Sequence, residues 1–288
     1  MINFKTLPIL FMGLGMYLPS AAAEEMQMSP VMNKTNIMQV ASMQGGNAPA
    51  DARSSDYSDG YEYRHMAGWE ETDAITFDKV IADQMEYRAN NAGNNSLRYD
   101  MQGWRGTDYN KAWLKLEGDD ERQTKTGSLE LQTLYSHAVS AFWDVQVGAR
   151  YDRLYSPNTV KDRFLAVIGF QGLAPYWFDL EPALFISDKG DVSARITGTY
   201  DLLFTQRLIL QPRLEMNVAF TDVPQFGIGK GVNGMQLGMR LRYEITRKFA
   251  PYIGIAQQRK LGNTASFAST GGEAINNRSL IVGLRWWF

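Results

Sequence analysis

Residues 280–288 read LIVGLRWWF, and this stretch is the strongest indication of the fold. Its side chains alternate between an apolar face and a second face that includes Gly283 and Arg285. Alternation with a period of two that runs to a terminal aromatic residue is typical of the closing strand of an outer-membrane β-barrel. A soluble protein has little reason to end in two tryptophans and Phe288, because chain termini are usually frayed and polar. We therefore expect a barrel in a bacterial outer membrane.

The N-terminal residues agree with this expectation. Residues 1–5 carry a single positive charge, residues 7–18 form an apolar run, and residues 19–23 (PSAAA) supply a small-residue cleavage site before Glu24. This is the pattern of a secretory signal peptide, which we place at residues 1–23. After Glu24, no apolar run approaches the roughly 20 residues that a membrane-spanning helix needs.

The composition of the chain changes near Ile75. Residues 24–74 are poor in β-branched and aliphatic residues, rich in Met, Ser, Asn, Gly and Ala, and without sustained periodicity. Such a composition predicts a disordered or loosely ordered segment. Residues 75–288 contain alternating segments separated by turn signals, and we expect them to form the barrel.

Twelve strands are predicted in the barrel, an even number as is usual for bacterial barrels. Their connections alternate between long and short, and the long ones include 153–162, 221–234 and 261–277. Because such barrels place short turns in the periplasm and longer loops outside, both ends of the barrel segment are expected in the periplasm. The predicted strands are 77–88, 96–104, 109–118, 127–136, 142–152, 163–172, 176–187, 192–203, 208–220, 235–246, 251–260 and 278–288.

The alternation also predicts what fills the barrel. Charged residues of both signs fall on the inward faces, where they avoid the cost of a lone charge in lipid. At this density the charges should pair and leave little open pore. Pro182 and Pro212 interrupt two strands, and we expect bulges there because proline cannot donate to the ladder. The predicted inward charges include Asp144, Arg150, Asp179, Glu181, Arg195, Asp201, Arg213, Glu215, Arg240, Arg242, Glu244 and Arg285.

A methionine cluster lies in the segment that precedes the barrel. Five methionines fall within eighteen residues: Met26, Met28, Met32, Met38 and Met43. Thioether sulfur is a soft, neutral ligand that favours Cu(I) and competes poorly for Zn(II) or Mg(II). Methionine also survives in an oxidising compartment in which a free thiol would form disulfides. The alternatives are an incidental cluster or an adaptable contact surface for a protein partner.

His65 and Met66 form a second candidate metal site. Histidine is the commonest metal ligand, and an adjacent methionine suits copper in either oxidation state. The alternative is an exposed loop histidine. The sequence contains no cysteine, so a thiolate metal site, a thiol nucleophile and a disulfide are all excluded.

Other functions find little support in the sequence. The net charge is −2 and no basic tract occurs, so no nucleic-acid partner is expected. Ser136 and His137 could suggest a hydrolase, but neighbouring strand residues point to opposite faces and cannot share a hydrogen bond. Asp179 and Glu181 could act as an acid–base pair, although ion pairs with arginines inside the barrel are the simpler interpretation. We therefore expect no enzyme activity.

Several segments resemble the copper resistance protein B family, and together they cover residues 75–288. The first are QMEYR (84–88), QGW (102–104), DYNKAWLK (108–115), AFWDVQVG (141–148) and QGLAPYWF (171–178). The others are GDVSAR (190–195), YDLL (200–203), TQRLILQPR (205–213), LRYEITR (241–247) and FAPY (249–252). The resemblance implies an outer-membrane protein of a copper-resistance system that acts beside a periplasmic multicopper oxidase. It leaves copper sequestration, copper passage and docking of the oxidase open as mechanisms.

Family members often carry methionine and histidine together in a longer tail, whereas this tail has only His65, which favours Cu(I) over Cu(II). We therefore predict an outer-membrane protein whose Met-rich periplasmic segment binds copper and which contributes to copper homeostasis. The alternative is a general small-solute porin or structural barrel whose methionines are incidental. A lipid-modifying barrel enzyme is a third possibility, which the placement of Ser136 and His137 disfavours.

Overall fold

The computed structural model describes residues 75–91 and 93–288. The predicted signal peptide and the Met-rich segment lie outside the described residues. Almost all of the described chain is β-sheet, with two short 3₁₀ turns, η3 (Pro175–Trp177) and η4 (Pro224–Phe226), and one helix, α2 (Gly262–Thr270). No helix of this part of the chain is long and apolar enough to cross a membrane.

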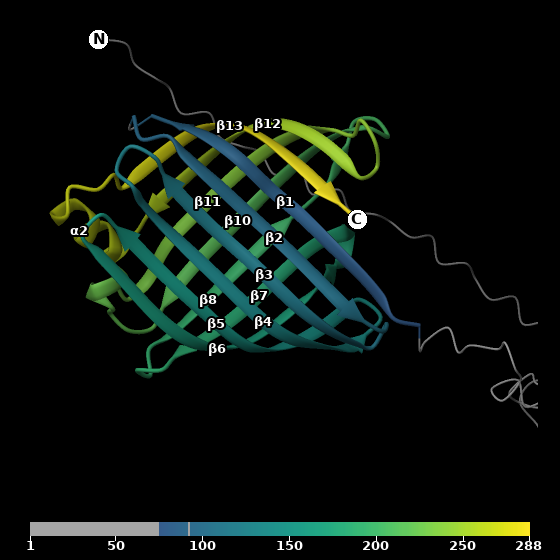
Figure 1. The fold of residues 1–288 in the computed structure, drawn as a ribbon, viewed down its shortest axis with the longest axis horizontal. Coiled ribbons are helices and arrows are strands. Elements are labelled where there is room, and N and C mark those ends of the chain that lie inside the picture. Colours follow the sequence, from purple (N-terminus) through teal and green to yellow (C-terminus); the bar gives the residue numbers. More distant parts are fainter. Residues whose placement is uncertain (1–74, 92) are drawn as a thin grey trace, which may run out of the picture. The chain divides into compact units, whose positions relative to one another are not determined.

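The strands form a single antiparallel sheet that closes into a barrel (Figure 1). Strand β1 pairs with β13, and the pairing of β10 with β11 completes the ring. The two-residue strand β9 continues the line of β8 along β10 in the same register, so the ring has the twelve strands that the sequence predicts. The bounds are β1 (Phe77–Asn90), β2 (Ser96–Gly106), β3 (Asn110–Glu121), β4 (Thr126–Ser140), β5 (Trp143–Ser156), β6 (Thr159–Ala174), β7 (Phe178–Ser187), β8 (Val192–Thr199), β9 (Leu202–Leu203), β10 (Leu208–Ala219), β11 (Gly231–Tyr243), β12 (Phe249–Lys260) and β13 (Asn276–Trp287).

The two faces of the sheet differ in chemistry. On β13, Leu280 and Val282 point outward and are 66% and 62% exposed, whereas Ile281 between them is 1% exposed. The same alternation places apolar side chains around the outside of the barrel and most of the charged side chains inside, beside two small apolar clusters. A closed sheet satisfies its own backbone groups, and an apolar outer belt suits hydrocarbon, so this is an outer-membrane barrel in contact with lipid.

One bulge changes which residues of β1 face inward. The register shifts by one residue between Ala82 and Gln84 on the β2 side of the strand, which leaves Asp83 as the extra residue. Both Asp83 and Gln84 then reach the lumen, where Asp83 accepts a hydrogen bond from Arg285 at 2.7 Å. The sequence pattern alone did not predict this second inward carboxylate on β1.

The bulges that we expected at the two strand prolines are absent, so this prediction is wrong. The pairs on either side of Pro182 keep one register, and the same is true of Pro212. Instead, the ladder is interrupted. Pairs are missing between Gly169 and Gly172 opposite Pro182, and β8 and β9 are separated by two residues opposite Pro212. Proline therefore removes ladder bonds without inserting an extra residue.

The connections are shorter than predicted, because the strands continue into several of the expected loops. The predicted long loop 153–162 is wrong: only residues 157–158 separate β5 from β6. The two longest connections are 220–230 and 261–275, and the second contains α2. Both lie at the end of the barrel opposite to the start of β1 and the finish of β13. We call the end where β1 starts and β13 finishes the terminal end, and the end with the two long connections the distal end (Figure 1).

A charge placed on the outer belt should destabilise the barrel. Ile253 on β12 is 60% exposed on the outer face, and an arginine near the bilayer midplane costs about 2–4 kcal/mol. We expect the Ile253→Arg variant to lose this free energy of unfolding in a denaturant titration in phospholipid. Gln258→Arg adds the same charge on the same strand beside the polar distal cavity and should change stability little. Equal losses in both variants would contradict the assignment of faces.

Candidate functional site: a divided and charged lumen

The residues predicted to bind metal lie outside the described residues. These are Met26, Met28, Met32, Met38, Met43, His65 and Met66. Within residues 75–91 and 93–288, no group of three or more His, Cys, Asp or Glu side chains is arranged to hold a metal ion. The site that the structure does describe is the lumen of the barrel.

Two cavities occupy the lumen, one at each end. The terminal cavity has a volume of about 450 Å³ and reaches the mouth of the barrel beside Trp177 and Asp201. The distal cavity is larger, about 1190 Å³, and extends to η4 and α2. Three residues line both cavities, namely Glu117, Phe185 and Arg195. These three residues and Glu130, which binds Arg195, form the layer between the cavities, which we call the septum.

Arg195 is the central residue of the septum. Its guanidinium extends from β8 to the opposite wall, where Nη2 donates to Glu130 on β4 at 2.7 Å and Nη1 donates to Glu117 on β3 at 3.3 Å. Its Nε donates to Asn217 on β10 at 3.1 Å. The guanidinium also lies 5.6 Å from the ring centroid of Phe185. Arg195 thus ties together strands that are not neighbours in the sheet.

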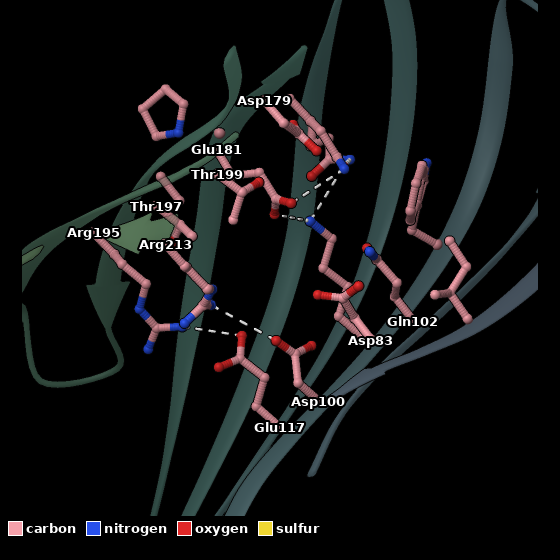
Figure 2. A pocket seen from close by; sticks show the side chains of 18 of the residues that line it. Asp83, Asp100, Gln102, Glu117, Asp179, Glu181, Arg195, Thr197, Thr199 and Arg213 are labelled. Atoms are coloured by element: carbon pink, nitrogen blue, oxygen red, sulfur yellow. Dashed lines mark hydrogen bonds and ion pairs between the residues drawn. The ribbon is translucent and has the colours of Figure 1, made fainter. Parts of the chain in front are cut away.

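A second group of cross-lumen contacts lies beside the septum. Arg213 on β10 is 3.7 Å from Asp100 on β2, and Arg98 on β2 is 3.7 Å from Glu215 on β10. Figure 2 shows guanidinium groups of Arg195 and Arg213 facing the carboxylates of Glu117 and Asp100. The predicted pairing of inward charges is therefore confirmed for these residues, and the pairs fill the middle of the lumen.

The most buried charges lie against the wall formed by β11, β12, β13 and β1. Glu86 is 2% exposed and accepts hydrogen bonds from Arg88, Arg240 and the Tyr252 hydroxyl. Tyr252 reaches Glu86 by lying over Gly283, where a Cβ atom would stand 2.5 Å from the tyrosine ring. A residue larger than glycine at position 283 would push the ring away from this network.

The two carboxylates singled out in the sequence lie on the wall of the terminal cavity. Glu181 accepts a hydrogen bond from Lys115 at 2.8 Å, as the ion-pair interpretation predicts. Lys115 also lies 5.4 Å from the ring centroid of Trp113. The Asp179 carboxylate forms no hydrogen bond or ion pair with another described side chain, so the ion-pair interpretation does not hold for it.

Ser136 and His137 lie on opposite faces of β4, as predicted. Ser136 is fully buried and donates to Asp144 at 3.0 Å, and Asp144 also binds Lys111 at 2.8 Å. His137 is exposed on the outer face, with Nδ1 2.8 Å from Asn110 Oδ1. The two side chains have different partners and do not form a serine–histidine pair.

The distal cavity is partly covered by the two long connections. Lys161 on β6 donates to the Gln225 carbonyl at 2.5 Å, and Arg163 lies 4.6 Å from the ring centroid of Phe226. Both contacts hold η4 against a strand on the other side of the mouth. The glycine-rich stretch 227–231, part of the predicted long loop 221–234, is tied to α2, because the Gly229 amide donates a hydrogen bond to Thr264 Oγ1 at 2.7 Å.

Comparison with known proteins places the chain in a family. The model of the family described as "Copper resistance protein B precursor" matches residues 76–288. A copper resistance protein B homolog from Pseudomonas syringae pv. tomato is 36% identical over 292 aligned positions, which cover 99% of this chain and 97% of the relative. Copper resistance protein B from Escherichia coli is 40% identical over 209 positions, which cover 73% and 69%.

Solved barrels resemble the structure more distantly. The KdgM porin aligns with a TM-score of 0.44 and 8% identity, covering 74% of this chain and 99% of the porin. Outer membrane phospholipase A from Escherichia coli aligns with a TM-score of 0.45 and 11% identity, covering 75% and 94%. On the strength of the family model and of both curated relatives, the chain belongs to the copper resistance protein B family.

Proposed function

We propose that the protein contributes to copper resistance by binding Cu(I) on the Met-rich segment that precedes the barrel. Membership in the copper resistance protein B family supports the role in copper resistance. The five methionines between Met26 and Met43 carry the proposal of Cu(I), because thioether sulfur favours soft cations. His65 and Met66 extend the same segment with a second candidate site.

The chemistry of the lumen supports placing the copper on this segment. The lumen is lined by carboxylates, guanidinium groups, amides and aromatic rings, and hard oxygen ligands suit Cu(I) poorly. Of the five barrel methionines, Met85, Met101, Met216 and Met239 alternate with inward-facing residues and therefore point toward lipid, and Met235 borders the distal cavity as a single sulfur. Sulfur ligands are thus concentrated before Ile75.

The segment is proposed to lie in the periplasm. Bacterial barrels place their shorter turns on the periplasmic side and their longer loops outside. The two longest connections of the described chain, 220–230 and 261–275, are both at the distal end, which argues for a periplasmic terminal end. A segment that leads into β1 would then start on the periplasmic side, where a multicopper oxidase of the same resistance system could receive or exchange copper. We assign the protein no enzymatic chemistry.

If the Met-rich segment binds copper, its removal should abolish copper binding. In an anaerobic competition titration with a Cu(I) chelator, we expect the mature protein to bind Cu(I) tightly. A truncated form that starts at Ile75 should not compete with the chelator. The physical reason is that truncation removes Met26, Met28, Met32, Met38, Met43, His65 and Met66 together. Equal binding by both forms would place the site in the barrel and refute the proposal.

A matched pair of variants can separate sulfur coordination from the general effects of substitution. Changing the five methionines at 26, 28, 32, 38 and 43 to leucine should abolish Cu(I) binding, because leucine keeps the bulk but lacks the sulfur. The control carries the same five changes at the methionines of the barrel domain, which are Met85, Met101, Met216, Met235 and Met239. The control should bind Cu(I) like the mature protein, and a loss of binding only in the control would contradict the assignment.

A further inference from the structure

The lumen is not a uniform channel, because its two cavities carry opposite excess charge. Six carboxylates and five cations line the terminal cavity. The distal cavity is lined by five carboxylates and by six cations at inward-facing positions, while Arg153 and Arg259 border it from outward-facing positions of β5 and β12. The terminal carboxylates are Asp83, Asp100, Glu117, Asp179, Glu181 and Asp201. The inward-facing distal cations are Arg98, Arg150, Lys161, Arg163, Arg195 and Lys260.

The septum lies at the change of sign. Arg195 and Glu117 are the charged residues common to both linings, and Glu130 binds Arg195 from the distal side. Glu130 also pairs with Arg150 at 2.7 Å, and Arg150 lies 4.4 Å from the centroid of the Phe185 ring. Phe185 in turn packs with the buried side chains of Leu134, Leu165 and Val167. The septum is thus supported by an ion-pair group and by an apolar cluster.

We propose that the septum closes the lumen to ions and that Arg195 is the residue that prevents cations from passing it. Cations can enter the acidic terminal cavity, but the path beyond it requires displacing a guanidinium held by two carboxylates on the opposite wall. The cationic lining of the distal cavity adds repulsion on the far side. This inference concerns the barrel and does not depend on whether the Met-rich segment binds copper.

The geometry also identifies Arg195 and Glu130 as the residues that set ion selectivity. If the guanidinium is removed, Glu130 still pairs with Arg150 and Glu117 with Arg98, but the constriction loses one positive charge between the two carboxylates and becomes more negative. If the Glu130 carboxylate is removed instead, Arg195 and Arg150 both lose a partner and their positive charges face the path. The two substitutions should therefore have opposite effects on the selectivity of any current.

Planar-bilayer recordings test this proposal. In a KCl gradient, we expect the native protein to carry no steady current and Arg195→Gln to carry a steady current with a cation-selective reversal potential. Glu130→Gln should shift the reversal potential toward anions relative to Arg195→Gln. The control is Arg153→Gln, because Arg153 lies near the distal cavity but pairs with Asp162 on the outward face of β5, away from the septum. This control should stay closed.

Two outcomes would overturn the proposal. One is a steady ohmic current through the native protein, which requires no variant to fold. The other is a closed lumen in Arg195→Gln when heat-modifiable migration in gel electrophoresis shows that the variant is folded. A reversal potential for Glu130→Gln that equals that of Arg195→Gln, or is more cation-selective, would refute the assignment of selectivity to the septum.

The opposite charge of the two cavities can be tested without altering the septum. Ser193 lines only the distal cavity and Thr197 only the terminal cavity, and they flank Arg195 on the inward face of β8. Because the chain has no cysteine, a single cysteine at either position is the sole thiol. We would compare its reaction rates with cationic and anionic methanethiosulfonate reagents in detergent. The cation-to-anion rate ratio should be about tenfold higher for Thr197→Cys than for Ser193→Cys. Equal ratios would contradict the charge asymmetry.

Discussion

Hydrocarbon solvates neither backbone amides nor charged side chains, and this constraint governs the rest of the structure. The sheet has to close, so β1 pairs with β13 and no strand edge faces lipid. Every second residue of each strand then points into a lumen of limited width. Since that lumen is the only place for charge at bilayer depth, both signs of charge collect there and come within hydrogen-bonding distance of each other. The septum follows from the same requirement that makes the protein a barrel.

The ion pairs inside the barrel determine the form of the lumen more than they contribute to the free energy of folding. Removing one partner of a buried ion pair costs about 3–5 kcal/mol, but an intact pair contributes little net free energy because desolvation offsets the attraction. The geometry of the pairs nevertheless matters for function, because Arg195 bridges strands β8, β4 and β3 across the lumen. An apolar filling could also close the lumen, but it would not create one cavity with excess carboxylates and another with excess cations. The ion pairs therefore make the two ends of the lumen different in charge.

The sequence predicted the faces well and the partners poorly. Alternation placed Arg195, Glu215 and Arg240 inside, because a residue's face depends only on its own strand. It could not say that Arg195 would bind Glu130, which lies 65 residues away, since that contact depends on barrel width and strand stagger. The bulge at Asp83 left no local signal. The tight turn at residues 157–158 did have a signal in Pro157 and Asn158, which a closer treatment of turn residues would have found.

The two parts of the chain suit different chemistry, and this separation bears on how a copper resistance protein B can work. Thioether sulfurs, which favour soft cations, are concentrated in the methionines between Met26 and Met43, whereas the terminal cavity presents hard oxygens in front of the Arg195 guanidinium. A Cu(I) ion that entered the terminal cavity would exchange sulfur ligands for carboxylates that bind it weakly, and it would then meet Arg195. Transfer through the barrel is therefore opposed by ligand chemistry and by electrostatics together. The proposed retention of copper on the Met-rich segment, with the barrel as its anchor in the membrane, requires neither of these steps.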